Sequence, residues 1–190
     1  MRAAIILAAG RSRRFGIANK LLVRRHGKTL LQSAVQIALS APVCRVIVVT
    51  SVDDARLRGA VLTTSNSRVS VLFARDHRDG HHASLLHGLN ALRRREREAL
   101  VFLGDMPDLT PATARRLTRL TAAGYKAVRP SYQDTPGHPV LIRDVDWVCK
   151  RLETGMPPFG RDEVLHVNEG RHTVLDIDRP GDLQRIGSRR

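Results

Sequence analysis

The sequence predicts a single α/β domain, spanning residues 1–190, in which helices cover both faces of a mostly parallel sheet. Three observations lead to this prediction. Short apolar runs typical of buried strands alternate with segments whose apolar residues recur at helical spacing. A chain of 190 residues can bury a sizeable core without disulfide or metal cross-links. No repeat, linker or low-complexity stretch divides the chain.

Four apolar runs predict the main strands of the sheet. The first is continuous and soon meets Gly10, which is typical of a strand buried on both faces. The four runs cover residues 3–8, 45–50, 69–73 and 99–103. Beyond residue 123 the regular alternation of strand-like and helix-like segments ends, and only short β-like pieces with more loop between them are expected. These pieces are residues 127–128, 139–142 and 173–177.

Helices are predicted between the strands from apolar residues that recur on one side. Residues 29–41 carry such a stripe, which stops before Pro42. Residues 84–92 carry four leucines at helical spacing. A third helix over residues 111–122 begins with Thr110 as N-cap and Pro111 at the first helical position.

Positive charge dominates the composition. The chain has 32 Lys+Arg against 18 Asp+Glu, a net charge of +14, and only four of the basic residues are lysines. The densest basic run lies at residues 93–97. Such charge can bind nucleic acid, but aromatic residues make up 4% of the chain and none accompanies the run, which disfavours nucleic acid as a partner. An anionic small-molecule substrate explains the charge equally well.

The remaining composition indicates a globular, cytoplasmic protein with no membrane partner. The apolar runs are far shorter than the roughly 20 residues that span a bilayer. The first apolar run is also too short for the apolar core of a signal peptide. The two cysteines, Cys44 and Cys149, show no spacing typical of metal or disulfide frameworks.

A loop rich in small residues follows the first predicted strand. Residues 7–10 read Leu-Ala-Ala-Gly, and Arg14 and Lys20 follow. Small residues let backbone amides approach an anion closely, as in loops that cradle phosphates. The spacing fits neither the dinucleotide-binding glycine motif nor the P-loop. On spacing alone, a phosphate site and an ordinary turn between strand and helix both stay open.

A carboxylate follows the fourth predicted strand. Residues 104–107 read Gly-Asp-Met-Pro, so Asp105 lies at the carboxyl end of that strand. Ligands of open parallel sheets gather at this edge. A carboxylate there can hold Mg²⁺, which binds through one or two carboxylates together with substrate phosphates. An aspartate that only stabilises a turn is the alternative.

Five motifs occur in order between residues 7 and 183. They are Leu7-Ala8-Ala9-Gly10 with Arg14-Phe-Gly and Lys20, Gly80 with Ser84-Leu-Leu-His-Gly-Leu, Gly104-Asp-Met-Pro, Gly137-His-Pro-Val-Leu, and Leu175-Asp-Ile-Asp-Arg-Pro-Gly-Asp-Leu. Together they resemble the molybdenum cofactor nucleotidyltransferases, a family of MobA-like NTP transferases. Gly-Asp-Met-Pro and Gly-His-Pro-Val-Leu are more similar to the cytidylyltransferase (MocA-like) branch than to the guanylyltransferase branch.

The resemblance implies a Rossmann-like, three-layer α/β/α nucleotidyltransferase fold with a mostly parallel sheet. It also implies a reaction in which CMP passes from CTP to the molybdopterin cofactor, with release of pyrophosphate and with Mg²⁺ as cofactor. A molybdoenzyme that accepts the product is a further partner that the resemblance suggests.

The resemblance also assigns roles to individual residues. The catalytic residues it implies are Arg14, Lys20 and Asp105. The nucleotide-binding residues are Leu7, Ala8, Ala9, Gly10, Arg14, Lys20 and Ser84. Asp105 and Asp178 are the implied metal ligands, and His138 lies in the motif near the acceptor.

Other functions stay open at this stage. The same fold can use GTP, or another phosphorylated acceptor such as a sugar 1-phosphate. A protein that binds nucleotide or nucleic acid without transfer activity is an alternative of a different class, which the net charge of +14 supports.

Overall fold

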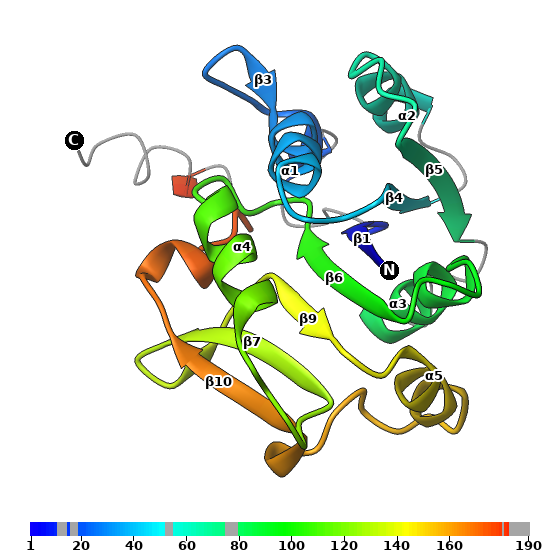
Figure 1. The fold of residues 1–190 in the computed structure, drawn as a ribbon. Coiled ribbons are helices and arrows are strands. Elements are labelled where there is room, and N and C mark those ends of the chain that lie inside the picture. The colour runs from blue at the N-terminus through cyan, green and yellow to red at the C-terminus, as the bar shows by residue number, and fades with distance from the viewer. Residues whose placement is uncertain (11–14, 16–18, 52–54, 75–79, 180, 183–190) are drawn as a thin grey trace.

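The computed structural model describes residues 1–10, 15, 19–51, 55–74, 80–179 and 181–182. Its centre is a sheet in the strand order β10-β7-β9-β6-β1-β4-β5, with β8 paired to β7 (Figure 1). The strands are β1 (Arg2–Ala8), β4 (Val46–Ser51), β5 (Val69–Ala74), β6 (Glu98–Leu103), β7 (Ala127–Tyr132), β8 (Thr135–Pro136), β9 (Val140–Ile142) and β10 (Val164–Asn168). A separate hairpin joins β2 (Arg24–Arg25) to β3 (Lys28–Thr29).

The sheet is mostly parallel, and β9 runs against its neighbours. β1 pairs in parallel with both β4 and β6, β4 with β5, and β7 with β10. β9 lies between β6 and β7 and is antiparallel to both. The carboxyl ends of β1, β6, β7 and β10 therefore share one edge of the sheet, and β9 begins at that edge.

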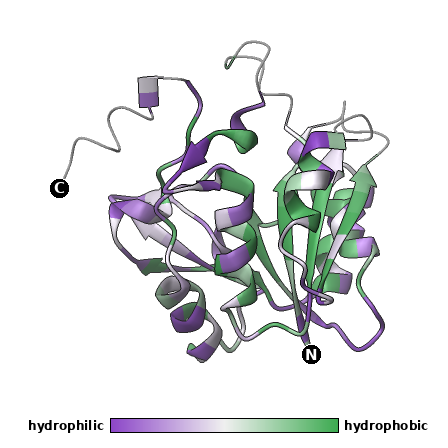
Figure 2. Ribbon diagram, turned by 90° about the horizontal axis from the view of Figure 1, so that it is seen from above, coloured by the Kyte–Doolittle hydropathy of each residue, from purple (hydrophilic) through white to green (hydrophobic). Residues whose placement is uncertain are grey.

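Helices cover both faces of this sheet, which confirms the predicted three-layer architecture. They are α1 (Leu30–Leu39), α2 (Ala55–Leu62), α3 (His81–Asn90), α4 (Pro111–Arg119) and α5 (Val145–Glu153), with short 3-10 turns η2 (Lys20–Leu22), η4 (Arg161–Glu163) and η5 (Arg171–Thr173). α1, α2 and α4 contribute to one hydrophobic cluster, and α3 and α5 to the other. Apolar colour fills the central strands of the sheet, whereas the helices beside them carry both apolar and polar colour (Figure 2).

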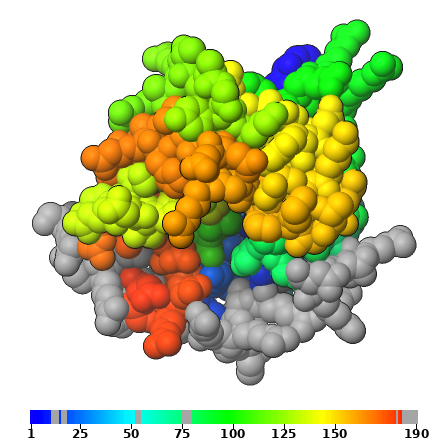
Figure 3. Space-filling model, turned by 90° about the horizontal axis from the view of Figure 1, so that it is seen from below, coloured from blue at the N-terminus to red at the C-terminus, as the bar shows by residue number. Residues whose placement is uncertain are grey.

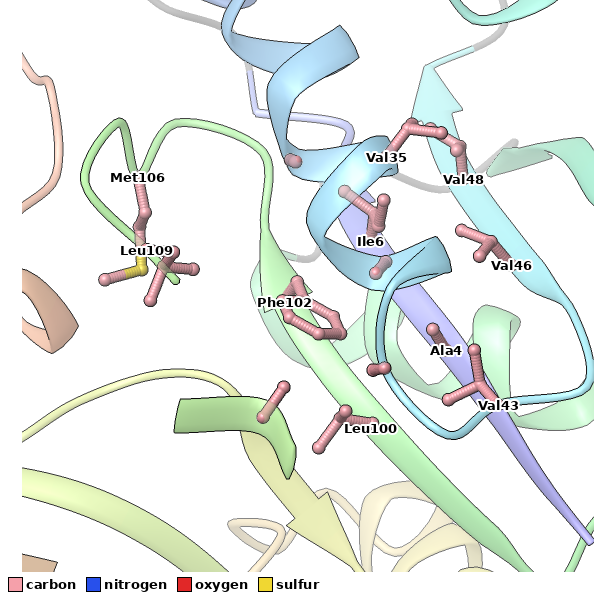
Figure 4. Close-up of a cluster of buried hydrophobic side chains, with 14 of the residues drawn as sticks. Ala4, Ile6, Val35, Val43, Val46, Val48, Leu100, Phe102, Met106 and Leu109 are labelled. Atoms are coloured by element: carbon pink, nitrogen blue, oxygen red, sulfur yellow. The ribbon is translucent and has the colours of Figure 1, made fainter. Parts of the chain in front are cut away.

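Alternation along the central strands builds the two cores. In β6, Leu100 and Phe102 enter the cluster beneath α1 and α4, whereas Val101 enters the cluster beneath α3 and α5. Figure 4 shows Phe102 beside Ile6 in the first of these clusters. Because both faces are buried, the central strands are apolar at nearly every position, as the sequence predicted.

The structure corrects several predicted boundaries. The helix predicted from residue 84 begins at His81, since the chain turns at Gly80, whose φ is +87°. The helix predicted to reach residue 122 ends at Arg119, because Leu120 is extended. Residues 173–177 were expected to be β-like, but Arg171–Thr173 form η5 and no strand includes residues 174–177. The outer edge of β7 is already paired with β10. The 171–178 segment therefore adds no strand there and instead bonds to the loops at the carboxyl edge of the sheet.

Sequence analysis missed α2, α5 and β10. α5 had a usable signal, because the Asp144 side chain accepts a hydrogen bond from the Trp147 N–H as an N-cap, and Val145, Val148 and Leu152 follow at helical spacing. None of the helices within the described ranges is long and apolar enough to cross a membrane.

A buried carboxylate ties the turn before β6 to the start of β4. Glu96 is 4% exposed and accepts hydrogen bonds from Arg45 Nε and Nη2, both at 2.7 Å, and from the Arg93 N–H at 2.7 Å. Cys44 Sγ donates to the same carboxylate at 3.2 Å. Burial would raise the pKa of Glu96, but these hydrogen bonds outweigh it and lower the pKa to about 2.

Replacing this carboxylate should therefore destabilise the fold. Glu96→Gln leaves the Arg45 guanidinium without its counter-ion, and we expect a loss of about 3 kcal/mol in unfolding free energy, measured by urea denaturation at pH 7. The Glu96 pKa is lower in the folded state, so its contribution is present above the unfolded value of 4.5 and is lost as pH falls toward 2. Asp146→Asn, in the exposed pair with Arg97, serves as the control and should cost little. Equal losses in the two variants would contradict the stabilising role of the buried Glu96 carboxylate.

Candidate functional site

The first and third sequence motifs meet at the carboxyl edge of the sheet. Leu7 of β1 is in register with Leu103 of β6, and the Gly104 N–H donates to the Leu7 carbonyl oxygen at 3.1 Å. The Leu-Ala-Ala-Gly loop and Asp105 therefore leave neighbouring strands at the same place. The topology thus juxtaposes two motifs that are about a hundred residues apart in the sequence.

Close packing at Gly104 brings Lys20 to the end of β6. A Cβ at Gly104 would lie 3.2 Å from the Leu21 side chain and 3.4 Å from the Leu7 carbonyl oxygen, so a larger residue would crowd both. Leu21 belongs to η2, whose N-cap is Asn19, and the Asn19 side chain accepts a hydrogen bond from the Leu21 N–H at 3.0 Å. The cap and the packing together fix the short turn that carries Lys20.

Two carboxylates contact the ammonium group of Lys20, and a third lies beside them. Its Nζ lies 2.6 Å from Asp105 Oδ2 and 3.0 Å from Asp178 Oδ1. Asp176 completes an acidic cluster, since Asp105, Asp176 and Asp178 each offer an oxygen within 4.8 Å of the other two. We call these three residues the acidic cluster.

Backbone contacts hold the acidic cluster together. The Ile177 N–H donates to the Asp105 carbonyl oxygen at 3.1 Å, which fastens the 171–178 segment to the loop after β6. The Asp182 carboxylate accepts from the N–H groups of Asp178 and Arg179 at 3.1 and 2.8 Å. These bonds set the position of Asp178.

The electrostatics of the cluster favour a bound cation. Burial would lower the pKa of Lys20, but its hydrogen bonds and ion pairs with Asp105 and Asp178 raise the pKa above its usual value. Loss of solvation and the charges of Asp105 and Asp178 raise the pKa of Asp176. Among the residues that the structure describes in this cluster, three carboxylates lie beside one ammonium group, and a set of carboxylate oxygens suits a hard divalent cation such as Mg²⁺ or Mn²⁺. The donor set therefore fits the metal that the resemblance implies.

Among the described residues, the small-residue loop leaves its last position open. Ala8 and Ala9 are buried at 2% and 7% exposure, whereas Gly10 is exposed and a Cβ added there would meet no atom within 4 Å. Leu7 lies in the paired part of β1. Arg14 lies outside the described residues, so its predicted role stays a prediction.

The structure locates the other two predicted site residues on different elements. Ser84 is buried in the first turn of α3, where its N–H donates to the Gly80 carbonyl oxygen at 3.4 Å. Its proposed contact with nucleotide stays a prediction. His138 precedes β9, and its N–H donates to the Thr173 carbonyl oxygen at 2.8 Å. A Cβ at Gly137 would overlap that same Thr173 oxygen, so only glycine permits this approach.

His138 lies at the same edge of the sheet as Asp105. β9 and β6 are antiparallel, and Val140 of β9 pairs with Val101 of β6. His138 comes two residues before Val140, and Asp105 comes four residues after Val101. Because the strands run in opposite directions, both residues lie beyond this pair on the same side. Burial, followed by the charges of Arg129 and His81, lowers the pKa of His138 to about 3. Its imidazole is therefore neutral at pH 7 and can exchange hydrogen bonds without carrying charge.

Sequence analysis missed one member of the acidic cluster, Asp176. A signal was present, because Asp176 and Asp178 are two residues apart in a segment predicted to be β-like, and such residues point to the same side. Sequence analysis selected Asp178 from this pair, and the structure brings both to Asp105.

Comparison with known proteins identifies the family. The family described as "MobA-like NTP transferase domain" matches residues 4–156. The chain belongs to this family. The family of the resemblance is therefore confirmed, although the match does not distinguish the cytidylyltransferase branch.

A curated relative and several solved structures are similar to this MobA-like chain. It is 33% identical over 145 residues to "Bifunctional protein GlmU" of Solibacter usitatus (strain Ellin6076), covering 74% of the chain but only 30% of that relative. The crystal structure of Rv0371c from Mycobacterium tuberculosis H37Rv is 26% identical, with a TM-score of 0.80 over 97% of this chain and 96% of that one.

Two further solved structures share the fold of the MobA-like chain. A manganese complex of Rv0371c is 24% identical, with a TM-score of 0.75 over 97% of each chain. The CMP:2-keto-3-deoxy-manno-octonic acid synthetase complexed with CTP is 14% identical, with a TM-score of 0.72 over 97% of this chain and 96% of that one. At these identities the likeness concerns the fold.

Replacing Lys20 with an uncharged residue should strengthen metal binding at the acidic cluster. Lys20 occupies the space between Asp105 and Asp178, so a divalent cation must compete with its ammonium group. For Lys20→Met we expect roughly tenfold tighter Mn²⁺ binding, measured by the electron paramagnetic resonance signal of free Mn²⁺. The control is Lys28→Met, since Lys28 is exposed and bonded to Gln36 on α1. Weaker Mn²⁺ binding by Lys20→Met would show that Lys20 does not compete with the cation.

Proposed function

We propose that the chain is a nucleotidyltransferase that uses Mg²⁺ to transfer CMP from CTP to the molybdopterin cofactor, with release of pyrophosphate. The observation that carries the proposal is the acidic cluster with Lys20, beside the small-residue loop at the carboxyl edge. This is the edge at which open α/β sheets bind their ligands. Membership of the MobA-like family supports the reaction type.

The proposed reaction needs positioning and charge neutralisation rather than a covalent intermediate. The terminal phosphate oxygen of the acceptor attacks the α-phosphorus of the nucleotide in line, forming one P–O bond. The bond between the α-phosphorus and the bridging oxygen breaks, and pyrophosphate leaves with the electron pair. The protein must hold two anions together and offset the charge that develops on the leaving group.

Different residues of the site hold the anions and offset their charge. The exposed Gly10, which follows the buried Ala8 and Ala9, offers backbone to the phosphates of the nucleotide without a side chain in the way. Lys20 supplies positive charge next to them. Asp105, with Asp176 and Asp178, would hold Mg²⁺, which supplies charge neutralisation for the triphosphate when bound.

The choice of base and acceptor rests on the sequence motifs. Gly-Asp-Met-Pro and Gly-His-Pro-Val-Leu are similar to the cytidylyltransferase branch, and the fold also occurs in a synthetase solved with CTP. His138 is the proposed acceptor-side residue in the second of these motifs. GTP, or a different phosphorylated acceptor, is the alternative within the same reaction class.

Nucleotide-dependent stabilisation tests the base. We expect CTP with Mg²⁺ to stabilise the protein against thermal unfolding more than GTP, ATP or UTP does. A ligand at 100 times its Kd adds about 2.7 kcal/mol, which is enough to rank the four nucleotides. Pyrophosphate release on addition of molybdopterin cofactor then tests transfer. Stabilisation without pyrophosphate release from any nucleotide would favour a nucleotide-binding protein instead.

Asp105→Asn tests the metal ligand. The substitution keeps the size of the side chain but removes its charge, so we expect metal-dependent turnover to fall at least about a hundredfold. Asp105 lies in a loop after β6 rather than in the core, so the melting temperature should change little. The control is Asp108→Asn in the same loop, where Asp108 pairs with Arg25 of the β2–β3 hairpin. An Asp105→Asn protein that is largely unfolded would instead indicate a structural aspartate.

A further inference from the structure

Arg129 is a half-buried arginine on β7 that bonds to a backbone carbonyl. Its Nε and Nη2 donate to the Gly137 oxygen at 3.2 and 3.0 Å. Within the part of the chain that the structure describes, no carboxylate lies within ion-pair distance of it. Other partly buried arginines do have such partners: Arg2 pairs with Glu98, Arg25 with Asp108 and Arg45 with Glu96.

Two histidines flank this arginine. His166 of β10 is in register with Arg129 on the adjacent parallel strand, so their side chains share one face of the sheet. Leu165 and Val167 pack against the cluster beneath α1 and α4, which assigns Arg129 and His166 to the opposite face. His138 follows Gly137, the residue whose carbonyl oxygen Arg129 holds.

One face of the molecule is hollowed between the segments that include β8 and β10. Figure 3 shows a depression bordered by the lime-green segment that includes β8, the orange segment that includes β10, and the red segment beyond η5. The 171–178 segment connects the two parts of the site, since Thr173 bonds to His138 and Ile177 bonds to Asp105. Because β9 lies between β7 and β6, Arg129 lies on the far side of His138 from β6.

Among Arg129, His138 and His166, only the arginine carries a fixed charge. The pKa of His138 is lowered to about 3 by burial and then by the charge of Arg129, and the pKa of His166 is lowered by partial loss of solvation and then by the same charge. Both rings are neutral at pH 7 and can donate hydrogen bonds. An uncompensated guanidinium in a half-buried position is costly, and an oxyanion relieves that cost through charge-assisted hydrogen bonds.

We propose that Arg129, together with His138 and His166, binds a phosphate monoester group of the acceptor. This inference rests on the proposed function, since it concerns the second substrate of the same site. It assigns a role to two residues, Arg129 and His166, that no sequence motif indicated. It also gives the acceptor a binding group that is separate from Lys20 and the acidic cluster.

Inorganic phosphate is the probe that tests this site. Titration of the metal-free protein should move the imidazole NMR signals of His138 and His166 in a saturable way. Arg129→Gln keeps a donor for the Gly137 carbonyl but removes the charge, and we expect at least tenfold weaker phosphate binding. Arg119→Gln is the matched control, because Arg119 is an exposed arginine near the end of α4. Equal affinity of Arg129→Gln and wild type, or no saturable shift in wild type, would overturn the proposal.

Two further measurements separate a loss of phosphate binding from a folding defect of Arg129→Gln and from a failure of the proposed function. His166→Ala changes an exposed side chain, so it should fold even if Arg129→Gln does not, and we expect it to weaken phosphate binding at least threefold. Unchanged affinity in His166→Ala would also contradict the proposal. Stabilisation by CTP with Mg²⁺ should be the same in Arg129→Gln and wild type. A wild-type protein that no nucleotide stabilises would refute the proposed function. The phosphate titration tests the phosphate site independently of that result.

Discussion

Asp105 is the point at which three distant parts of the chain are joined. Its carboxylate pairs with Lys20 from the turn after β1, and its carbonyl oxygen accepts the N–H of Ile177 from the segment near the carboxyl terminus. The strand that precedes it brings Asp105 to the edge through the register of β6 with β1. The site therefore depends on one residue whose backbone and side chain serve different partners. Backbone hydrogen bonds such as the one from Ile177 to Asp105 help to position the carboxylates of the acidic cluster, and Lys20 contacts two of these carboxylates directly.

The arginine excess divides into structural and unassigned parts. Arg45 neutralises Glu96, and Arg2 pairs with Glu98, so several arginines stabilise the starts of strands at the edge opposite the site. Arg116 pairs with Glu169 across the surface. Each of these arginines is neutralised by a carboxylate, so the net charge of +14 comes from the other basic residues. The net charge of +14 still provides a field that attracts anionic substrates.

The sequence predicted the central strands well, because β1, β4 and β6 are buried on both faces and leave a continuous apolar pattern. It also predicted Asp105 and Lys20 as site residues, since both occur in motifs beside such strands, and the structure brings the two side chains together. It did not predict β10, whose residues alternate in burial and include His166 and Asn168. Nor did it predict Asp176 as a member of the acidic cluster, although the spacing of Asp176 and Asp178 was a local signal, and the Ile177–Asp105 bond that brings them to Asp105 was not predictable. It gave no indication of Arg129, which we propose as an acceptor-binding residue, because the β7–β10 register is a long-range contact with no local pattern in the sequence.

The reversed direction of β9 has a consequence for how the site can diversify. Because β9 runs against β6 and β7, it contributes to the site through the residues before its first position, whereas β1 and β6 contribute through the residues after their last. The proposed nucleotide side and the proposed acceptor side are thus built from segments that belong to different halves of the sheet. Changes in the 133–138 segment, which includes β8, can reshape the proposed acceptor side while the β1–β6 junction keeps its register. The same scaffold can in this way adopt new acceptors without rebuilding the part that we propose binds the triphosphate.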